Sequence, residues 1–201
     1  AVDVAKIQDV ITPELKKAGN KLVWLRAPRD QYDLPDYAGI MDQYEKLHND
    51  IQAGKVVSAY ALDRHGIAAA VSKMAFGNAL GVKIEHNLDP RDFFAPGFGD
   101  IIMEVPADKV GQLSITYTLI GEVTDDGKFS YGNTVITEKE AEEAWKGTLE
   151  RVFKTTSGED NEKQAKDDLY HAENIYVCKH KVAKPRVFIP VFPGTNCEYD
   201  S

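Results

Sequence analysis

The sequence has few cysteines, no long apolar run and a deficit of positive charge, and each shortage excludes a class of protein. Two cysteines, Cys178 and Cys197, among 201 residues do not support a disulfide framework, so a reducing compartment is expected. No apolar run approaches the ~20 residues of a membrane helix, and the first 20 residues lack the apolar core of a signal peptide. We therefore expect a cytoplasmic protein without a membrane partner. Lys and Arg number 24 against 32 Asp and Glu, which argues against binding nucleic acid, because phosphates are neutralised by cations.

Common catalytic and nucleotide-binding motifs are also missing. The chain contains no G-x-G-x-x-G loop, Walker A loop, G-x-S-x-G elbow or H-E-x-x-H pair. His171, Cys178 and His180 suggest zinc, but their spacing matches no zinc motif and a fourth ligand is not evident. We therefore expect no metal site in this chain.

What the sequence does contain is a globular composition, with 43% hydrophobic and 28% charged residues. Short apolar runs predict strands, and apolar residues spaced three and four apart predict helices. Strands are expected at 21–25, 56–62 (buried on both faces), 81–85, 100–105, 113–123, 129–131 and 134–136, and helices at about 40–51, 67–76 and 90–94. Asp125-Asp126-Gly127 predicts a hairpin turn. This order predicts an α+β fold with a mixed sheet and helices.

The chain changes character after about residue 155. Thr137 and Glu140 form a capping box, which predicts a helix whose apolar face runs through Trp145 to Val152. The residues that follow form a polar linker. Further strands are predicted at 175–178 and 186–192. We interpret 1–155 as one subdomain, 156–184 as a linker and 185–201 as the truncated start of a second domain.

The best candidate site is the turn Asp63-Arg64-His65-Gly66, where a strand leads directly into a helix. Free backbone N–H groups and a positive dipole end are expected there. Gly66 would let a ligand approach the backbone, and Arg64 and His65 would contact its phosphate. The alternative interpretation is that Asp63 caps the helix while Arg64 and His65 lie in solvent.

Other candidate residues have structural explanations. Asp89, Arg91 and Asp92 would suit a metal, but acids in the first turn of a short helix explain them better. Asp125 and Asp126 are interpreted as turn residues in preference to catalytic or metal-binding residues. Cys197 lacks a neighbouring base and an oxyanion hole, so it is interpreted as structural rather than nucleophilic.

Two stretches together resemble one family. The glycine-led helix GIAAAVSKMAFGN at 66–78 resembles the C-terminal domain of aminoimidazole ribonucleotide synthetase-like proteins. The segment 186–201, with FPGTNC at 192–197, is similar to the opening of a class I glutamine amidotransferase domain. The two modules occur in this order in single-chain phosphoribosylformylglycinamidine synthases.

The resemblance implies a ligase of de novo purine synthesis. Such enzymes use ATP, Mg²⁺ and glutamine to convert formylglycinamide ribonucleotide to the amidine. This chain would be the last C-terminal synthetase subdomain, and its partners would be the other synthetase subdomains and a glutaminase domain of the same polypeptide. No catalytic residue is expected in this fragment, which alone would be inactive.

The resemblance departs from the family pattern at the candidate turn. Family members commonly carry His-Asp and then Ser-Asp-Gly-Gly-Leu. Here Tyr60 and Ala61 stand at the His-Asp, Arg64 at the second Asp and His65 at the first Gly. A carboxylate metal site is therefore excluded here.

One alternative to the ligase interpretation is a non-catalytic interaction domain of the same fold. Another is a selenophosphate, thiamine-phosphate or hydrogenase-maturation enzyme, although these lack a fused amidotransferase.

Overall fold

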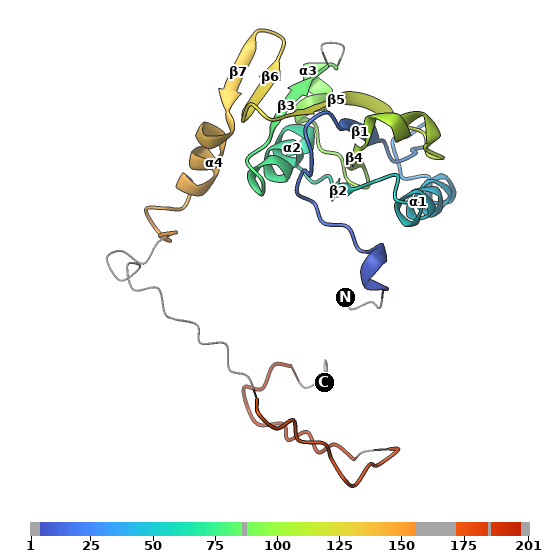
Figure 1. Ribbon diagram of the computed structural model, residues 1–201, viewed down its shortest axis with the longest axis vertical. Helices are drawn as coiled ribbons and strands as arrows, with labels where there is room; N and C mark the ends of the chain where they lie inside the picture. The colour runs from blue at the N-terminus through green and yellow to red at the C-terminus, as the bar shows by residue number, and fades with distance from the viewer. Residues whose placement is uncertain (1–4, 86–87, 156–171, 185, 198–201) are drawn as a thin grey trace. The chain divides into compact units, whose positions relative to one another are not determined.

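The computed structural model describes residues 5–85, 88–155, 172–184 and 186–197. The chain divides into two units, Ala1–Thr156 and Ser157–Ser201. All helices and strands of the described residues lie in the first unit. They are η1 (Ile7–Asp9), β1 (Lys21–Leu25), α1 (Tyr37–Gln52), β2 (Ser58–Ala61), α2 (Gly66–Phe76), β3 (Gly81–Ile84), α3 (Pro90–Phe94), β4 (Ile101–Val105), η2 (Ala107–Gln112), β5 (Thr118–Thr124), β6 (Lys128–Tyr131), β7 (Thr134–Thr137) and α4 (Glu138–Gly147) (Figure 1).

The strands form one sheet of seven, in the order β2-β4-β1-β5-β3-β6-β7. Neighbouring strands are antiparallel except for β3 and β6, which pair in parallel. The predicted mixed sheet with helices is therefore confirmed. Both faces of β1 are covered by packed side chains, which explains why its sequence is almost continuously apolar.

Alternate residues of β1 contribute to two separate cores. Leu22 and Trp24 pack on the face that carries α2, whereas Val23 and Leu25 pack with Leu47 of α1 on the other face. This division follows from the two-residue repeat of a strand. The α2 core also contains the wholly buried Ile67 and Met74, and the α1 core contains Met103 and Val105 of β4; all four have 0% exposure.

A buried carboxylate attaches the N-terminal segment to this sheet. Glu104 of β4 has no exposed surface. It accepts hydrogen bonds from the backbone N–H of Lys16 at 2.7 Å and of Lys17 at 3.0 Å, and from Asn20 Nδ2 at 2.7 Å. The bonds hold the segment before β1 against the sheet, where Leu15 enters the α2 core.

Three sequence predictions about the sheet are wrong. The predicted strand 113–123 is shorter, because Asp50 and Gln43 of α1 accept the backbone N–H groups of Ser114 and Thr116. The strand predicted at 56–62 to be buried on both faces is shorter, and of the four residues of β2 Ser58 alone is fully buried. β2 is an edge strand and pairs with β4.

The turn at 125–127 is not a hairpin, since β3 lies between β5 and β6. It passes directly over Gly81 at the start of β3, where a Cβ would lie 2.4 Å from Asp126 Oδ1. The hairpin of this region is instead β6–β7.

The helix that begins at the Thr137–Glu140 capping box is confirmed, but it ends at Gly147. The apolar face predicted to continue to Val152 therefore does not form, and Val152 is exposed. No strand forms in the described residues of the second unit, so the strands predicted at 175–178 and 186–192 are wrong. These residues lack a neighbouring strand, and an isolated strand cannot satisfy its backbone groups.

Candidate functional site

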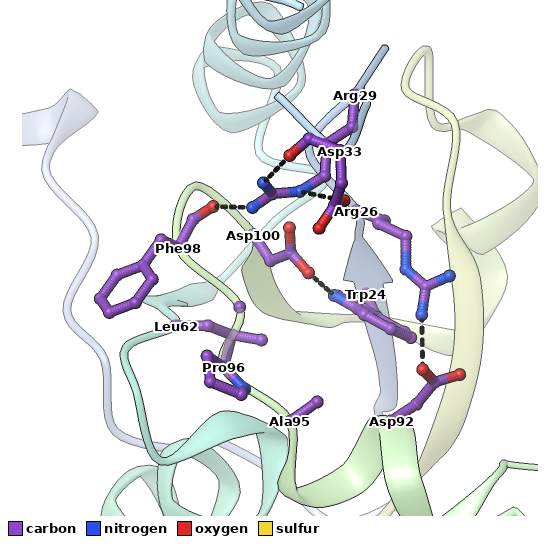
Figure 2. Close-up of a pocket in the computed structure, with 11 residues that line it drawn as sticks. Trp24, Arg26, Arg29, Asp33, Leu62, Asp92, Ala95, Pro96, Phe98 and Asp100 are labelled. Carbon is purple, nitrogen blue, oxygen red and sulfur yellow. Dashed lines mark hydrogen bonds and ion pairs between the residues drawn. The ribbon is translucent and has the colours of Figure 1, made fainter. Parts of the chain in front are cut away.

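A cavity of about 520 Å³ lies where three strands of the sheet meet at one end. β1 ends there at Leu25 and β2 ends at Ala61, and both are in register with Ile101 at the start of β4. The loops that follow β1 and β2 and the loop that precedes β4 supply most of the walls. The lining residues are Trp24, Arg26, Arg29, Asp33, Leu62, Asp92, Ala95, Pro96, Gly97, Phe98 and Asp100 (Figure 2).

Asp100 is the buried acid of this cavity, with 4% of its surface exposed. Its carboxylate accepts hydrogen bonds from Trp24 Nε1 and from the backbone N–H of Ala27, each at 2.9 Å. Burial raises the pKa of Asp100, although these bonds and the nearby Arg26 and Arg29 act in the opposite direction. The aspartate therefore fixes both the indole and the turn that follows β1.

Arg26 lies over the indole of Trp24. The guanidinium carbon is 4.2 Å from the ring centroid, a cation–π geometry. Arg26 Nη2 also forms an ion pair of 2.9 Å with Asp92 Oδ1 of α3 (Figure 2). Both side chains are partly exposed, at 57% and 42%, so water competes for this pair and its net contribution to stability is small.

Arg29 has a different role, because its donors are used by the protein itself. Nη1 donates to the carbonyl of Asp33 and Nη2 to the carbonyl of Phe98, each at 3.1 Å. Its Nε lies 3.7 Å from Asp33 Oδ1. Arg29 thereby joins the loop after β1 to the loop before β4, and it fixes one wall of the cavity.

The predicted site residues of the 63–66 turn form an exposed network. Asp63 Oδ1 accepts the backbone N–H of His65 at 2.7 Å and lies 3.1 Å from His65 Nδ1. Arg64 Nε donates to His65 Nε2 at 3.2 Å. The His65 backbone bond is the main reason why the pKa of Asp63 is lowered, with the His65 ring and Lys73 adding to it.

Gly66 is explained by the packing of the chain on itself. Its φ of +69° is unfavourable for other residues, and a Cβ would lie 2.5 Å from the carbonyl oxygen of Ala95. Its N–H donates to the carbonyl of Asp63. The space beside Gly66 is thus filled by the 93–95 backbone, whereas the sequence had suggested access for a ligand.

The turn and the cavity are neighbours but are not one site. The carbonyl of Asp63 also accepts the N–H of Gly97, which lines the cavity. Leu62, directly before the turn, is another lining residue, but Arg64 and His65 are not. The predicted turn and the cavity therefore lie at the same end of the sheet but involve different side chains.

The acids that the sequence analysis assigned to a helix start and a turn, rather than to a metal, have protein partners. Asp89 caps α3 by accepting the N–H of Arg91 at 2.8 Å, as the helix-start interpretation predicted. Asp92 pairs with Arg26, and Asp126 accepts from Thr124 and Lys128 within its turn. Within the described ranges, no group of three or more His, Cys, Asp or Glu side chains is arranged to hold a metal. In the same part of the chain, no helix is both long and apolar enough to cross a membrane.

Sequence reasoning missed Trp24, Arg26 and Asp100. Asp100 lies 76 residues after Trp24, and no local spacing connects them. The available signal was limited to position: an arginine directly after a buried strand and an aspartate directly before another.

Two curated proteins of similar sequence are PurL subunits from different organisms. No protein-family model matches the chain. The phosphoribosylformylglycinamidine synthase subunit PurL of Corynebacterium aurimucosum is 27% identical over 109 residues, which are 49% of this chain and 14% of that protein. PurL of Lactobacillus delbrueckii subsp. bulgaricus is 27% identical over 73 residues, 36% of this chain and 10% of that protein.

The structural comparison agrees with the sequence comparison. Phosphoribosylformylglycinamidine synthase II of Thermotoga maritima matches with a TM-score of 0.57 and 13% identity, over 68% of this chain and 28% of that one. T. maritima PurL complexed with FGAR matches with a TM-score of 0.56 and 12% identity, over 67% and 30%. The resemblance of the synthetase part to phosphoribosylformylglycinamidine synthase is confirmed, and the chain has the aminoimidazole ribonucleotide synthetase type of fold. The chain spans less than a third of each of these relatives.

Proposed function

We propose that this chain is a synthetase subdomain of an ATP-dependent ligase of purine biosynthesis. The reaction would convert formylglycinamide ribonucleotide, glutamine and ATP to formylglycinamidine ribonucleotide. The observation that carries the proposal is that the sequence matches and the fold matches name the same enzyme, PurL. One of the matching PurL structures is a complex with FGAR and another a complex with ATP.

The described residues fit only part of the chemistry. Mg²⁺ prefers carboxylate, carbonyl and water oxygens in octahedral geometry, and the described residues present no group of acids that could hold it. The chain also lacks the glycine-rich loops that hold a triphosphate. We therefore assign magnesium and the ATP phosphates to other subdomains and derive no step through them here.

The chain would act together with further domains. We propose 1–155 as the subdomain, 156–184 as a linker and 185–201 as the start of a glutaminase domain. The remaining synthetase subdomains would belong to the same polypeptide. A T. maritima assembly called PurLQS matches this chain in fold, which supports a partner requirement. The 201-residue chain alone would then have neither ligase nor glutaminase activity.

A second candidate is a non-catalytic interaction domain of the same fold. It is favoured by the 63–66 turn, where the family's acids are replaced and the side chains satisfy one another. Under the leading proposal, Arg64 and His65 instead contact a phosphate group of a substrate when the turn is part of the complete enzyme.

The test uses the complete polypeptide that contains this chain. Formylglycinamidine ribonucleotide is measured with and without ATP and glutamine, for the wild type, Arg64→Ala and the control Lys46→Ala, which removes an exposed cation of α1. The ligase proposal expects turnover that depends on both co-substrates, and loss of about tenfold or more in kcat/KM for Arg64→Ala only. An inactive wild type would favour the interaction-domain candidate. Full activity of Arg64→Ala would show that the 63–66 turn does not contact the substrate. Glutamine hydrolysis by the 201-residue chain would contradict the fragment assignment.

A further inference from the structure

The Arg26 guanidinium is positioned to bind an anion in the cavity. Its stacking over Trp24 orients the planar group without using its N–H donors. Throughout the described ranges, its one ion-pair partner is Asp92, through Nη2. Nε and Nη1 have no protein acceptor there. A guanidinium held in one plane with unused donors is the arrangement by which arginine binds phosphate oxygens in pairs.

The other charges around the cavity are engaged elsewhere. Arg29 uses its donors on the carbonyls of Asp33 and Phe98, and Asp33 faces solvent with 88% of its side chain exposed. Asp100 directs one oxygen to Trp24 and the other to the N–H of Ala27. Asp92 is therefore the acid that competes with a ligand for Arg26.

We propose that the cavity binds a phosphate monoester through Arg26, and that Asp92 occupies the place of the phosphate until it binds. Asp92 is 42% exposed, so it can turn into solvent when displaced and its charge stays hydrated. A phosphate dianion has more charge and more acceptor oxygens than the carboxylate it replaces. The volume of about 520 Å³ lies within the usual range for small-molecule sites. This inference rests on the proposed function and deepens it, because it adds Arg26 and the cavity to the neighbouring turn where Arg64 and His65 are proposed to contact a substrate phosphate.

The test measures binding by the 201-residue chain, so it is independent of ligase activity. Ribose 5-phosphate is titrated at constant ionic strength while the Trp24 indole and backbone amide resonances are followed by NMR. Ribose is the neutral control and succinate is the carboxylate control. We expect saturable shifts at Trp24 and in the 95–100 loop with ribose 5-phosphate, no response to ribose and weaker binding of succinate. No response to ribose 5-phosphate would overturn the proposal, as would equal affinity for succinate.

Two substitutions should act in opposite directions. Arg26→Ala should weaken binding about tenfold or more, and Arg26→Lys should weaken it less, because it keeps the charge but loses the planar donor pair. Asp92→Asn should tighten binding by about twofold to fivefold, which is the ratio expected from removing an exposed ion pair. The matched control is Asp42→Asn, which removes the same charge from the Asp42–Lys46 pair on α1 and should leave affinity unchanged.

The Asp92→Asn result decides the proposal even if Arg26→Ala fails to fold. Unchanged or weaker binding by Asp92→Asn would show that this carboxylate does not compete with the ligand. Equal tightening by Asp42→Asn would show that only the net charge of the chain matters. Either result would overturn the assignment. If the phosphate site is confirmed while the complete polypeptide has no ligase activity, the proposed function alone is wrong.

Discussion

Replacing Glu104 by glutamine tests how far one buried carboxylate secures the N-terminal segment to the sheet. The carboxylate accepts three hydrogen bonds, from the backbone of Lys16 and Lys17 and from the side chain of Asn20. In the glutamine variant the amide oxygen can keep two of these donors, at Lys17 and Asn20. The amide NH₂ then faces the N–H of Lys16, so two donors oppose each other in a buried space.

The magnitude follows from the number of bonds. A hydrogen bond to a charged group contributes ~1.5–3 kcal/mol, and an unsatisfied buried donor costs ~1–3 kcal/mol. Losing one charge-assisted bond and weakening two others should lower the free energy of unfolding by about 3 kcal/mol. That is a large part of the ~5–15 kcal/mol typical of a domain. The matched control is Glu122→Gln, which removes an ion pair with Lys21 at a partly exposed position and should cost less than about 1 kcal/mol.

Urea unfolding gives the stability of both variants, and amide hydrogen exchange locates the effect. In Glu104→Gln, the amides of Lys16 and Lys17 should exchange faster than those in the middle of β1. The segment also places Leu15 in the α2 core, where its N–H donates to the Met74 carbonyl at 2.8 Å. A loss below about 1 kcal/mol, or unchanged exchange at both lysines, would refute the view that Glu104 holds this segment.

Three further substitutions test separate features. Asp50→Asn should destabilise the chain by about 1–3 kcal/mol at neutral pH: burial opposes its ionisation, but bonds from Lys55 and Ser114 outweigh this and lower its pKa. This contribution to stability is present above the usual aspartate pKa and is lost as pH falls through the lower pKa of Asp50 in the folded state. The free energies of unfolding of wild type and variant should therefore converge in acid. A difference that stays constant in urea titrations at acid pH would contradict this. Gly66→Ala should lower the free energy of unfolding by more than about 2 kcal/mol, because its Cβ would lie 2.5 Å from the Ala95 carbonyl oxygen. The control Gly54→Ala has a φ of +63° but no atom within 4 Å of the new Cβ, so it should cost about 1 kcal/mol. Equal melting temperatures of the two variants would show that the contact with Ala95 does not matter. Trp145→Ala should lower the free energy of unfolding by about 1 kcal/mol, because the ring centroids of Trp145 and Phe76 are stacked 5.6 Å apart. An unchanged stability by calorimetry would mean that other contacts hold α4 in place.

Local patterns predicted the elements that depend on local interactions. The capping box at Thr137 and Glu140 marked the start of α4, and both its bonds are present. The apolar runs and helical spacings also located β1, α1 and α2. In each case the signal lies within the element, because caps and amphipathic faces are set by neighbours in sequence.

The predictions that were wrong depended on contacts between distant residues. Ser114 and Thr116 have a strand-like sequence, but their N–H groups are taken by α1 side chains 64 and 73 residues earlier. The position of β3 between β5 and β6 cannot be read from the turn that connects them. The cavity shows the same limit, because Arg26 and Asp92 form an ion pair although they are far apart in the sequence. Contacts between such distant residues cannot be predicted from the composition or the spacing of residues in the sequence.

The alternation of β1 limits how this cavity can change during evolution. Trp24 and Arg26 are two residues apart, and Trp24 packs on the α2 face while Leu25 packs on the α1 face. Inserting or deleting a single residue within the strand would exchange the two faces and send the indole into the opposite core. Substitutions, and length changes in the loops after β1 and before β4, leave this alternation of faces unchanged.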